Sequence, residues 1–264
     1  MRLAIGIEYD GTAYAGWQSQ TSARGVQSEV ERALGVVADH PVALVCAGRT
    51  DAGVHAACQV AHFDTTAQRR MRGWVFGANT NLPNDVALLW AVPVAPDFHA
   101  RYSARARSYR YVILNREVRP AIERKRVCWI HDPLDAPLMH EAAQALVGRH
   151  DFSSFRASEC QSPTPVRVVE SLTVRREGDR VIIEVTANAF LHHMVRNIAG
   201  TLITVGRGER PAGWVAEALA ARDRKAAGIT APAGGLYLTA VRYPEACGLP
   251  AVVPQPASAI MPGA

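Results

Sequence analysis

One carboxylate in this sequence stands in a setting that suits chemistry. Asp51 lies between Gly48 and Gly53, in a short stretch with apolar residues on both sides. The two glycines allow backbone conformations and close approaches that residues with side chains resist. Arg49, two positions earlier, is near enough to form an ion pair that would keep the carboxylate ionised. Because an ionised aspartate can act as a nucleophile or a proton acceptor, the stretch indicates a candidate catalytic turn.

Other interpretations of this turn stay open. Aspartate is common in ordinary turns because its side chain bonds its own backbone, and spacing alone favours that structural interpretation. A calcium loop of the EF-hand type is disfavoured, since the alternating aspartates that it requires are missing. Other segments of the sequence are therefore needed to distinguish a structural turn from a catalytic one.

Apolar periodicity predicts the elements that position this turn. Alternating apolar residues predict strands, and apolar residues three and four apart predict helices. The first part of the chain has predicted strands at residues 3–9, 42–47, 54–63 and 86–94, with helices at 26–38 and 67–77. The second part has predicted strands at 105–114, 166–175, 180–187 and 236–243, with helices at 136–146, 190–205 and 214–221.

This order of elements predicts an α+β fold. Each half has the pattern of an RRM-like or ferredoxin-like domain, in which helices cover one face of an antiparallel sheet. We expect residues 1–104 to form an N-terminal domain that carries Asp51 and residues 105–246 to form a C-terminal domain, with the active-site cleft between them. Residues 247–264 are rich in Pro and Ala and predict a weakly ordered tail.

The composition is that of a folded protein with a basic surplus. Hydrophobic residues make up 48% of the chain, and 29 Lys and Arg against 24 Asp and Glu give a net charge of +5. This surplus, mostly Arg, is compatible with a polyanionic partner. The five cysteines are widely spaced without a CxxC pair, which disfavours a zinc ribbon or a disulfide framework. The longest apolar stretch is too short to span a bilayer, and acidic residues near the N-terminus are untypical of a secretory signal, so we expect a cytoplasmic protein.

The turn at residues 48–56, Gly-Arg-Thr-Asp-Ala-Gly-Val-His-Ala, resembles the signature of the TruA family of tRNA pseudouridine synthases. Other segments resemble that family in order and spacing. They are YDGT at 9–12, GWQ at 16–18, NLP at 81–83, FHAR at 98–101, SYRY at 108–111, DFSSFR at 151–156, NAFLHHMVRN at 188–197 and GLYL at 235–238. Together these segments are much more specific than any one of them.

The resemblance implies an isomerase that converts uridine to pseudouridine in the anticodon stem–loop of tRNA, at positions 38, 39 and 40. It implies Asp51 as the catalytic carboxylate, Tyr109 as the active-site tyrosine, Arg196 near the Asp51 carboxylate and Leu236 as an apolar wall. It also implies a homodimer. The reaction is an isomerisation without redox change, hydrolysis or group donor, so neither a cofactor nor a metal is expected.

The strand pattern adds two candidate substrate-binding residues. Residues of equal parity share a face of a strand, which places Tyr109 beside Arg105 and Arg107, with Arg110 on the other face. An aromatic ring with guanidinium groups nearby suits an unstacked base. Each of these residues also has an ordinary interpretation, since a tyrosine in an alternating strand often packs in a core and an arginine often faces solvent.

Two adjacent histidines and several arginines are further candidates for metal and RNA binding. His192 and His193 do not predict a metal site, because adjacent residues of a helix point about 100° apart. Three groups of cations predict phosphate contacts that position an RNA. They are Arg69, Arg70 and Arg72; Arg101, Arg105, Arg107 and Arg110; and Arg124, Lys125 and Arg126.

Two other function classes are alternatives to the isomerase. A non-catalytic RNA-binding module is disfavoured because the aromatic RNP1 run of such modules is missing. A metal-dependent hydrolase is disfavoured because the sequence has neither a Walker loop nor a zinc signature.

Overall fold

The computed structural model describes residues 1–20 and 22–250. Contacts divide the chain into two compact units: unit 1 comprises Met1–Arg107 and the chain from Tyr237 onward, and unit 2 comprises Ser108–Leu236. By this division the strand that begins at residue 236 groups almost wholly with unit 1. Helices and strands occur in both units, and the predicted α+β class is confirmed.

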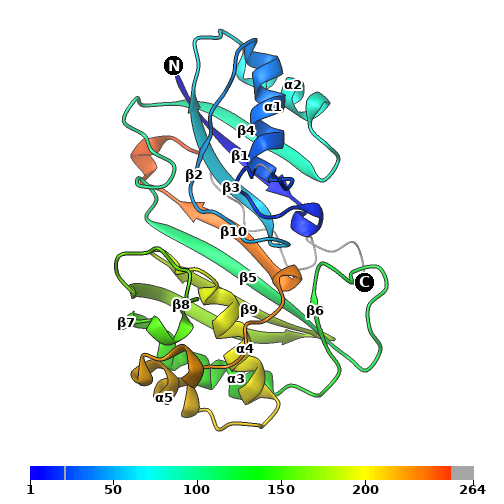
Figure 1. Cartoon of the computed structure of the whole chain (residues 1–264), viewed down its shortest axis with the longest axis vertical. Coiled ribbons are helices and arrows are strands. Elements are labelled where there is room, and N and C mark those ends of the chain that lie inside the picture. Colours follow the sequence, from blue (N-terminus) through cyan, green and yellow to red (C-terminus); the bar gives the residue numbers. More distant parts are fainter. Residues whose placement is uncertain (21, 251–264) are drawn as a thin grey trace. The chain divides into compact units, whose positions relative to one another are not determined.

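Unit 1 is built around the strand that begins the chain. This strand, β1 (Arg2–Tyr9), pairs antiparallel with β3 (His55–Asp64) on one side and with β4 (Val86–Val94) on the other (Figure 1). The short β2 (Val45–Cys46) pairs antiparallel with β3, whereas β10 (Leu236–Arg242) pairs with β3 in parallel. The expectation of purely antiparallel sheets is therefore wrong, because the returning end of the chain adds a parallel strand.

Both faces of the β1 strand are covered. Leu3, Ile5 and Ile7 are fully buried on one face, and the two helices of unit 1, α1 (Val26–Ala38) and α2 (Met71–Asn81), lie side by side (Figure 1). Ala4 is on the other face, because successive side chains alternate. There it belongs to a cluster with Phe98 and Ala100, against which Tyr243, Cys247 and Leu249 pack. Part of the predicted tail thus contributes to this cluster, and residues 251–264 lie outside the described part of the chain.

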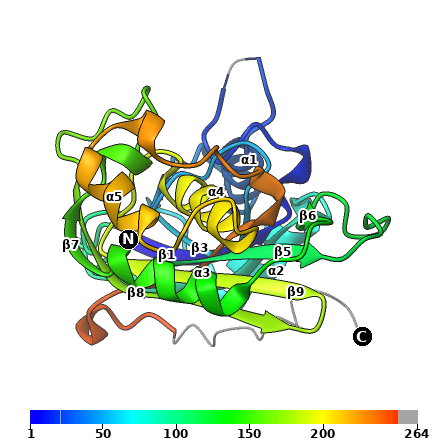
Figure 2. The ribbon, with the colours of Figure 1, turned by 90° about the horizontal axis from the view of Figure 1, so that it is seen from below.

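Unit 2 contains the remaining strands and helices. Its strands are β5 (Ala106–Asn115), β6 (Cys128–Ile130), β7 (Gly148–Asp151), β8 (Val166–Glu177) and β9 (Arg180–Ala187), and its helices are α3 (Ala136–Ala143), α4 (Met194–Gly206) and α5 (Trp214–Ala221). Strands β8 and β9 form the predicted hairpin, which turns at Gly178 with a positive φ of 57°. Strand β5 lies beside β9, β6 pairs with β5 in parallel, and α3 packs on β8 and α4 (Figure 2).

Several predicted elements differ from the structure at their ends. The helix predicted at 67–77 spans Met71–Asn81, because the backbone of Arg70 is still extended and the Ala67 N–H donates to the Thr65 hydroxyl rather than within a helix. The strand predicted at 42–47 is reduced to Val45–Cys46. The helix predicted at 190–205 begins at Met194, because His193 has a left-handed backbone with a φ of 60°. The short strands β6 and β7 were not predicted.

None of the helices formed by residues 1–20 and 22–250 has the length and apolar character needed to cross a bilayer.

Two helical glycines give a matched test of packing. A Cβ at Gly200 in α4 would lie 1.7 Å from the carbonyl oxygen of Ile229, whereas a Cβ at Gly73 in α2 meets nothing within 4 Å. We expect Gly200→Ala to destabilise the fold by several kcal/mol, because the clash is with backbone. Gly73→Ala should raise the free energy of unfolding by about 0.5–1 kcal/mol through helix propensity. Urea unfolding of both variants checks this, and equal effects would contradict the close packing at Gly200.

Candidate active site

The Asp51 side chain sits on a tight turn between β2 and β3. Residues 47–54 belong to no helix or strand, and Asp51 is half-buried. The turn closes where the Val54 N–H donates to the Asp51 carbonyl at 3.1 Å. Gly53 within it has a φ of 76°, in the left-handed region that favours glycine. The expected role of Gly53 in shaping the turn is therefore visible in its backbone.

A neighbouring segment of unit 1 holds this turn through main-chain hydrogen bonds. The Trp17 N–H donates to the Thr50 carbonyl at 3.0 Å, and the Gly53 N–H donates to the Tyr14 carbonyl at 3.3 Å. Between these contacts Gly16 has a φ of 107°, and a Cβ there would lie 2.7 Å from the Thr50 carbonyl oxygen. Only glycine allows the two backbones to approach so closely.

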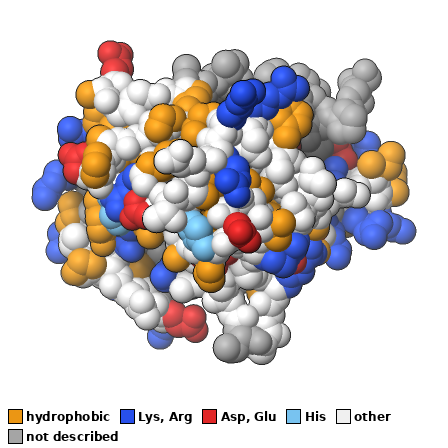
Figure 3. All heavy atoms as spheres, turned by 90° about the horizontal axis from the view of Figure 1, so that it is seen from above, with side chains coloured by type: hydrophobic (Ala, Val, Ile, Leu, Met, Phe, Trp, Pro, Cys, Tyr) orange, Lys and Arg blue, Asp and Glu red, His pale blue; other side chains and the backbone are white. Residues whose placement is uncertain are grey.

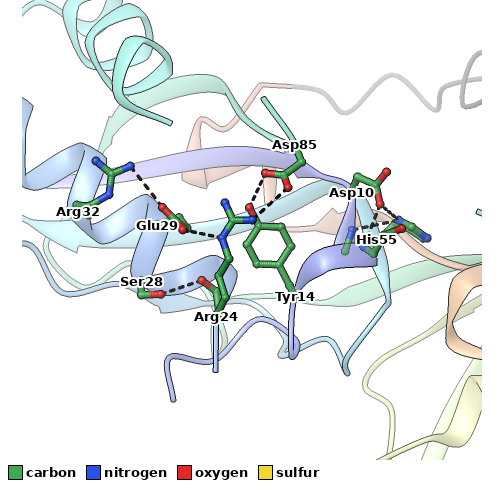
Figure 4. Close-up of polar contacts among 11 residues, drawn as sticks. Asp10, Tyr14, Arg24, Ser28, Glu29, Arg32, His55 and Asp85 are labelled. Carbon is green, nitrogen blue, oxygen red and sulfur yellow. Dashed lines mark hydrogen bonds and ion pairs between the residues drawn. The ribbon is translucent and has the colours of Figure 1, made fainter. Parts of the chain in front are cut away.

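This bracing segment is itself fastened by a polar network (Figure 4). The Tyr14 hydroxyl donates to Asp85 at 2.5 Å, and the Arg24 guanidinium lies over the Tyr14 ring, 4.5 Å from its centroid. Arg24 also pairs with Glu29 at the start of α1, at 2.8 Å. Burial, and then the bond to Asp85, raise the pKa of Tyr14, so its hydroxyl stays a donor. Tyr14 and Arg24 are thereby both fixed against neighbouring parts of unit 1.

The structure places Arg49 on the surface of unit 1. Its side chain is exposed, and its charge acts on Cys46. Burial raises the pKa of the Cys46 thiol to about 11, an effect that Arg49 partly opposes. The ion pair between Arg49 and Asp51 stays a prediction.

Tyr109 lies in β5, in unit 2, and is buried. Its ring meets Phe190 edge to face, with centroids 4.9 Å apart. On the opposite face of the strand, as parity predicts, Arg110 is buried and pairs with Glu184 at 2.7 Å. The nearby Tyr111 hydroxyl donates to the Pro232 carbonyl at 2.8 Å.

Arg107 and Arg105 have different environments. Arg107 is buried, and its guanidinium donates to the carbonyls of Ala47 at 2.9 Å and Arg101 at 2.6 Å. These bonds, which lie within unit 1, hold the Arg107 guanidinium against the main chain of Ala47, the residue that follows β2. Arg105 is exposed and precedes β5. With Arg107 and Arg110 buried, only Arg101 and Arg105 of that cation group are on the surface.

Arg196 and Leu236 occupy well-packed positions in unit 2. Arg196 is in the first turn of α4, and its Nε donates to the Ala231 carbonyl at 2.8 Å, while the Ala231 N–H donates back to the Arg196 carbonyl at 3.1 Å. The bond from Nε restrains the guanidinium, and the main-chain bond holds the first turn of α4 against Ala231. Leu236 is buried at the start of β10, and the preceding Gly235 leaves no room for a side chain beside the Val112 carbonyl.

The prediction that helical geometry separates the side chains of His192 and His193 is wrong. Both residues precede α4 rather than lie within it, and their rings are 4.0 Å apart. The left-handed backbone of His193 brings the rings together in place of the helical separation.

One surface aromatic was not identified from the sequence. Tyr102 is 76% exposed, and its ring stacks on His99 at 4.2 Å with an interplanar angle of 29°. The N–H groups of Arg101 and Tyr102 both donate to His99 Nδ1, which fixes the ring. The Arg101 guanidinium lies 5.7 Å from the Tyr102 centroid. The sequence places Tyr102 directly after the FHAR segment at 98–101, but it does not show that the ring is exposed. That exposure depends on the turn formed by residues 99–102.

A family model described as tRNA pseudouridine synthase matches residues 5–103 and 142–244 of this chain. These spans include the Asp51 turn, Arg196 and Leu236, whereas Tyr109 lies between them. The chain belongs to this family of enzymes, the tRNA pseudouridine synthases.

Curated relatives are similar over nearly their whole length. The protein named tRNA pseudouridine synthase A of Methylococcus capsulatus is 61% identical over 249 residues, covering 94% of this chain and 92% of the relative. Proteins of the same name from Coxiella burnetii and Vibrio campbellii are each 57% identical, covering 94% and 96% of this chain and 95% and 96% of the relatives. The resemblance seen in the motifs is thus confirmed across the chain.

A buried histidine in unit 1 gives a prediction about pH. His62 is 4% exposed and accepts the Ala100 N–H at Nδ1. Burial, with smaller effects of Arg2 and His99, lowers its pKa from 6.5 to about 4. Between these values the unfolded chain binds a proton that the folded chain does not, so stability falls as the pH drops from about 6.5 to about 4.

We expect His62→Asn, whose side-chain carbonyl can accept the same N–H, to flatten this dependence. The part removed is on the order of 2–3 kcal/mol, at about 1.4 kcal/mol per pKa unit. Urea unfolding at pH 7 and pH 4.5 measures it in both proteins. The same loss of stability in the variant would show that His62 is not the group responsible.

Proposed function

We propose that this chain converts uridine to pseudouridine in tRNA and that Asp51 is its catalytic carboxylate. The observation that carries the proposal is the braced turn that presents Asp51, in a chain whose relatives are tRNA pseudouridine synthases over nearly their whole length. Positions 38, 39 and 40 of the anticodon stem–loop are the proposed targets, on the resemblance of the motifs. A homodimer and a cytoplasmic location are part of the same proposal.

The reaction explains why a fixed carboxylate would be needed. The bond between N1 and C1′ breaks, the bond between C5 and C1′ forms, and the C5 hydrogen is replaced by one on N1, so atoms and electrons balance without a co-reactant. An ionised aspartate would serve as nucleophile at the sugar or the base, or as proton acceptor. Burial of the separated base and sugar from water would prevent side reactions.

We assign supporting roles to three residues of unit 2. Tyr109 would stack on the uracil or move a proton through its hydroxyl, Arg196 would interact with the Asp51 carboxylate, and Leu236 would supply an apolar wall. The anchoring of the Arg196 Nε to Ala231 supports its role, because it restrains the guanidinium. For these residues to act with Asp51, the active-site cleft would lie between the two units, as the sequence predicts.

The tRNA would be held by exposed cations and by stacking. The side chains of Arg69, Arg70, Arg72, Arg124, Lys125 and Arg126 are all exposed. On the face drawn in Figure 3, Lys and Arg side chains occur in separate groups with other side chains between them. Such groups suit phosphate contacts at several points of a folded RNA. We add Tyr102 as a stacking platform for an unpaired base, since its ring is exposed and supported by His99.

Asp51→Asn tests the central assignment. The variant keeps the shape of the side chain but loses the charge, so we expect product formation to fall at least 1,000-fold, an order of magnitude typical of a lost catalytic group, while tRNA binding changes little. The measurement is pseudouridine in a uridine-containing tRNA under single turnover, with binding followed separately. Near-normal turnover in the variant would remove Asp51 from the mechanism. A binding module, in contrast, would give no product even in the wild type, and a metal-dependent hydrolase would be inactivated by a chelator.

Tyr102 variants test the RNA-binding proposal. Stacking of a base on an aromatic side chain contributes roughly 1–3 kcal/mol, so Tyr102→Ala should weaken tRNA binding about 5- to 100-fold. Tyr102→Phe keeps the ring and should bind normally, whereas Tyr102→Leu keeps bulk only and should behave like Ala. The salt dependence of binding should not change, because no phosphate contact is lost. Equal affinity of the Leu and Phe variants would contradict stacking.

A further inference from the structure

The residue before Asp51 is held through its side chain. Thr50 is buried, and its hydroxyl lies 2.7 Å from the Tyr9 hydroxyl in a buried hydrogen bond. Tyr9 ends β1 and is also buried, with its ring 6.0 Å from that of Trp17. Since Thr50 precedes Asp51 directly, this bond restrains the backbone from which the Asp51 side chain starts.

The chain after Asp51 is restrained by the two residues that follow Tyr9, which contact His55. His55 is buried, and its Nδ1 lies 3.1 Å both from the Gly11 amide nitrogen and from an Asp10 carboxylate oxygen (Figure 4). A ring nitrogen carries either a proton or a lone pair, so it donates to Asp10 or accepts from Gly11 at a given moment. Either bond ties the same turn to the start of β3. The His55 ring also stacks on Tyr237 at 4.7 Å.

These contacts come from three consecutive residues, Tyr9, Asp10 and Gly11, which we call the 9–11 clamp. The pairing of β1 with β3 shifts register between Ile7 and Tyr9, and β1 ends at Tyr9, so Asp10 and Gly11 lie beyond the strand. Gly11 packs so closely that a Cβ there would lie 2.0 Å from the Val54 carbonyl oxygen. One short turn therefore contacts the chain on both sides of Asp51.

We propose that the 9–11 clamp positions the Asp51 carboxylate and that the Tyr9–Thr50 hydroxyl pair is its principal element on the side of Thr50. The proposal rests on the function proposed above. Tyr9 and Thr50 are positioning residues: they act through the backbone of the turn. A carboxylate that attacks or takes a proton must be held within a fraction of an ångström, and a displacement of about 1 Å can cost a hundredfold in rate.

The first experiment removes the hydroxyls singly. In Thr50→Val and in Tyr9→Phe the shapes are nearly kept, and we expect kcat for pseudouridine formation to fall about 10- to 100-fold. KM and the dissociation constant for tRNA should stay within about twofold, because the RNA contacts are intact. Thr50→Ser keeps the hydroxyl and should restore kcat to within about threefold of the wild type.

The double variant tests whether the two hydroxyls act as one unit. If they act through their shared bond, Tyr9→Phe combined with Thr50→Val should lower kcat no further than the worse single variant. Multiplied losses would mean that the two side chains act independently and would overturn the pairing.

A matched control separates positioning from general loss of stability. Tyr243 donates its hydroxyl to the Ala100 carbonyl at 2.6 Å, also within unit 1 but against another segment. Tyr243→Phe should lower the unfolding midpoint about as much as Tyr9→Phe, yet leave kcat within about twofold. An unchanged kcat in Thr50→Val, or an equal loss of kcat in Tyr243→Phe, would overturn the proposal. An inactive wild-type protein would instead contradict the proposed function itself.

Discussion

The Asp51 side chain lies on a turn that has no regular secondary structure, and hydrogen bonds within unit 1 restrain that turn. Neither a helix nor a strand ladder fixes residues 47–54, so other contacts must limit the freedom of the backbone. Unit 1 supplies them as hydrogen bonds from Trp17 to Thr50 and from Gly53 to Tyr14. The bracing segment is fastened in turn through Tyr14 and Asp85, so the restraint reaches back to the sheet and to α1.

Glycine is the residue that makes this bracing possible. Gly16 has a positive φ and lies against the Thr50 carbonyl, and Gly11 lies against the Val54 carbonyl. In both contacts the neighbouring carbonyl lies so close to the glycine that a Cβ atom there would clash with it. The motifs around Tyr9 and Gly16 are far from the Asp51 turn in the sequence, yet their glycines pack directly against its main chain. The glycines of the first two motifs are therefore needed for the same reason, which is to let their segments pack against the Asp51 turn.

Local patterns predicted most of the elements but not the details that depend on distant contacts. The helix Val26–Ala38 and the strand Arg180–Ala187 have the predicted ends, because their apolar periodicity and flanking turns are local signals. The start of α4 was predicted four residues too early, because the pattern of apolar residues does not reveal the left-handed backbone of His193. Arg107 was predicted to bind substrate because residue parity places it on the same face of the strand as Tyr109. Parity does not reveal that the Arg107 guanidinium donates to the carbonyls of Ala47 and Arg101.

At the Asp51 turn, too, local features could be predicted from the sequence and contacts between distant residues could not. Residue types and glycine spacing made Asp51 a candidate, and the resemblance of the motifs then favoured it as the catalytic residue. The partner of Thr50 could not be predicted, because a hydroxyl pair separated by 41 residues leaves no periodic signal. The nature of that partner also has a physical consequence. A hydroxyl pair is neutral, so it restrains the backbone at Thr50 without adding a charge beside the Asp51 carboxylate. The restraint on the turn is therefore separate from the electrostatic interaction with Arg196 that is proposed above, and the two can be altered independently by mutation.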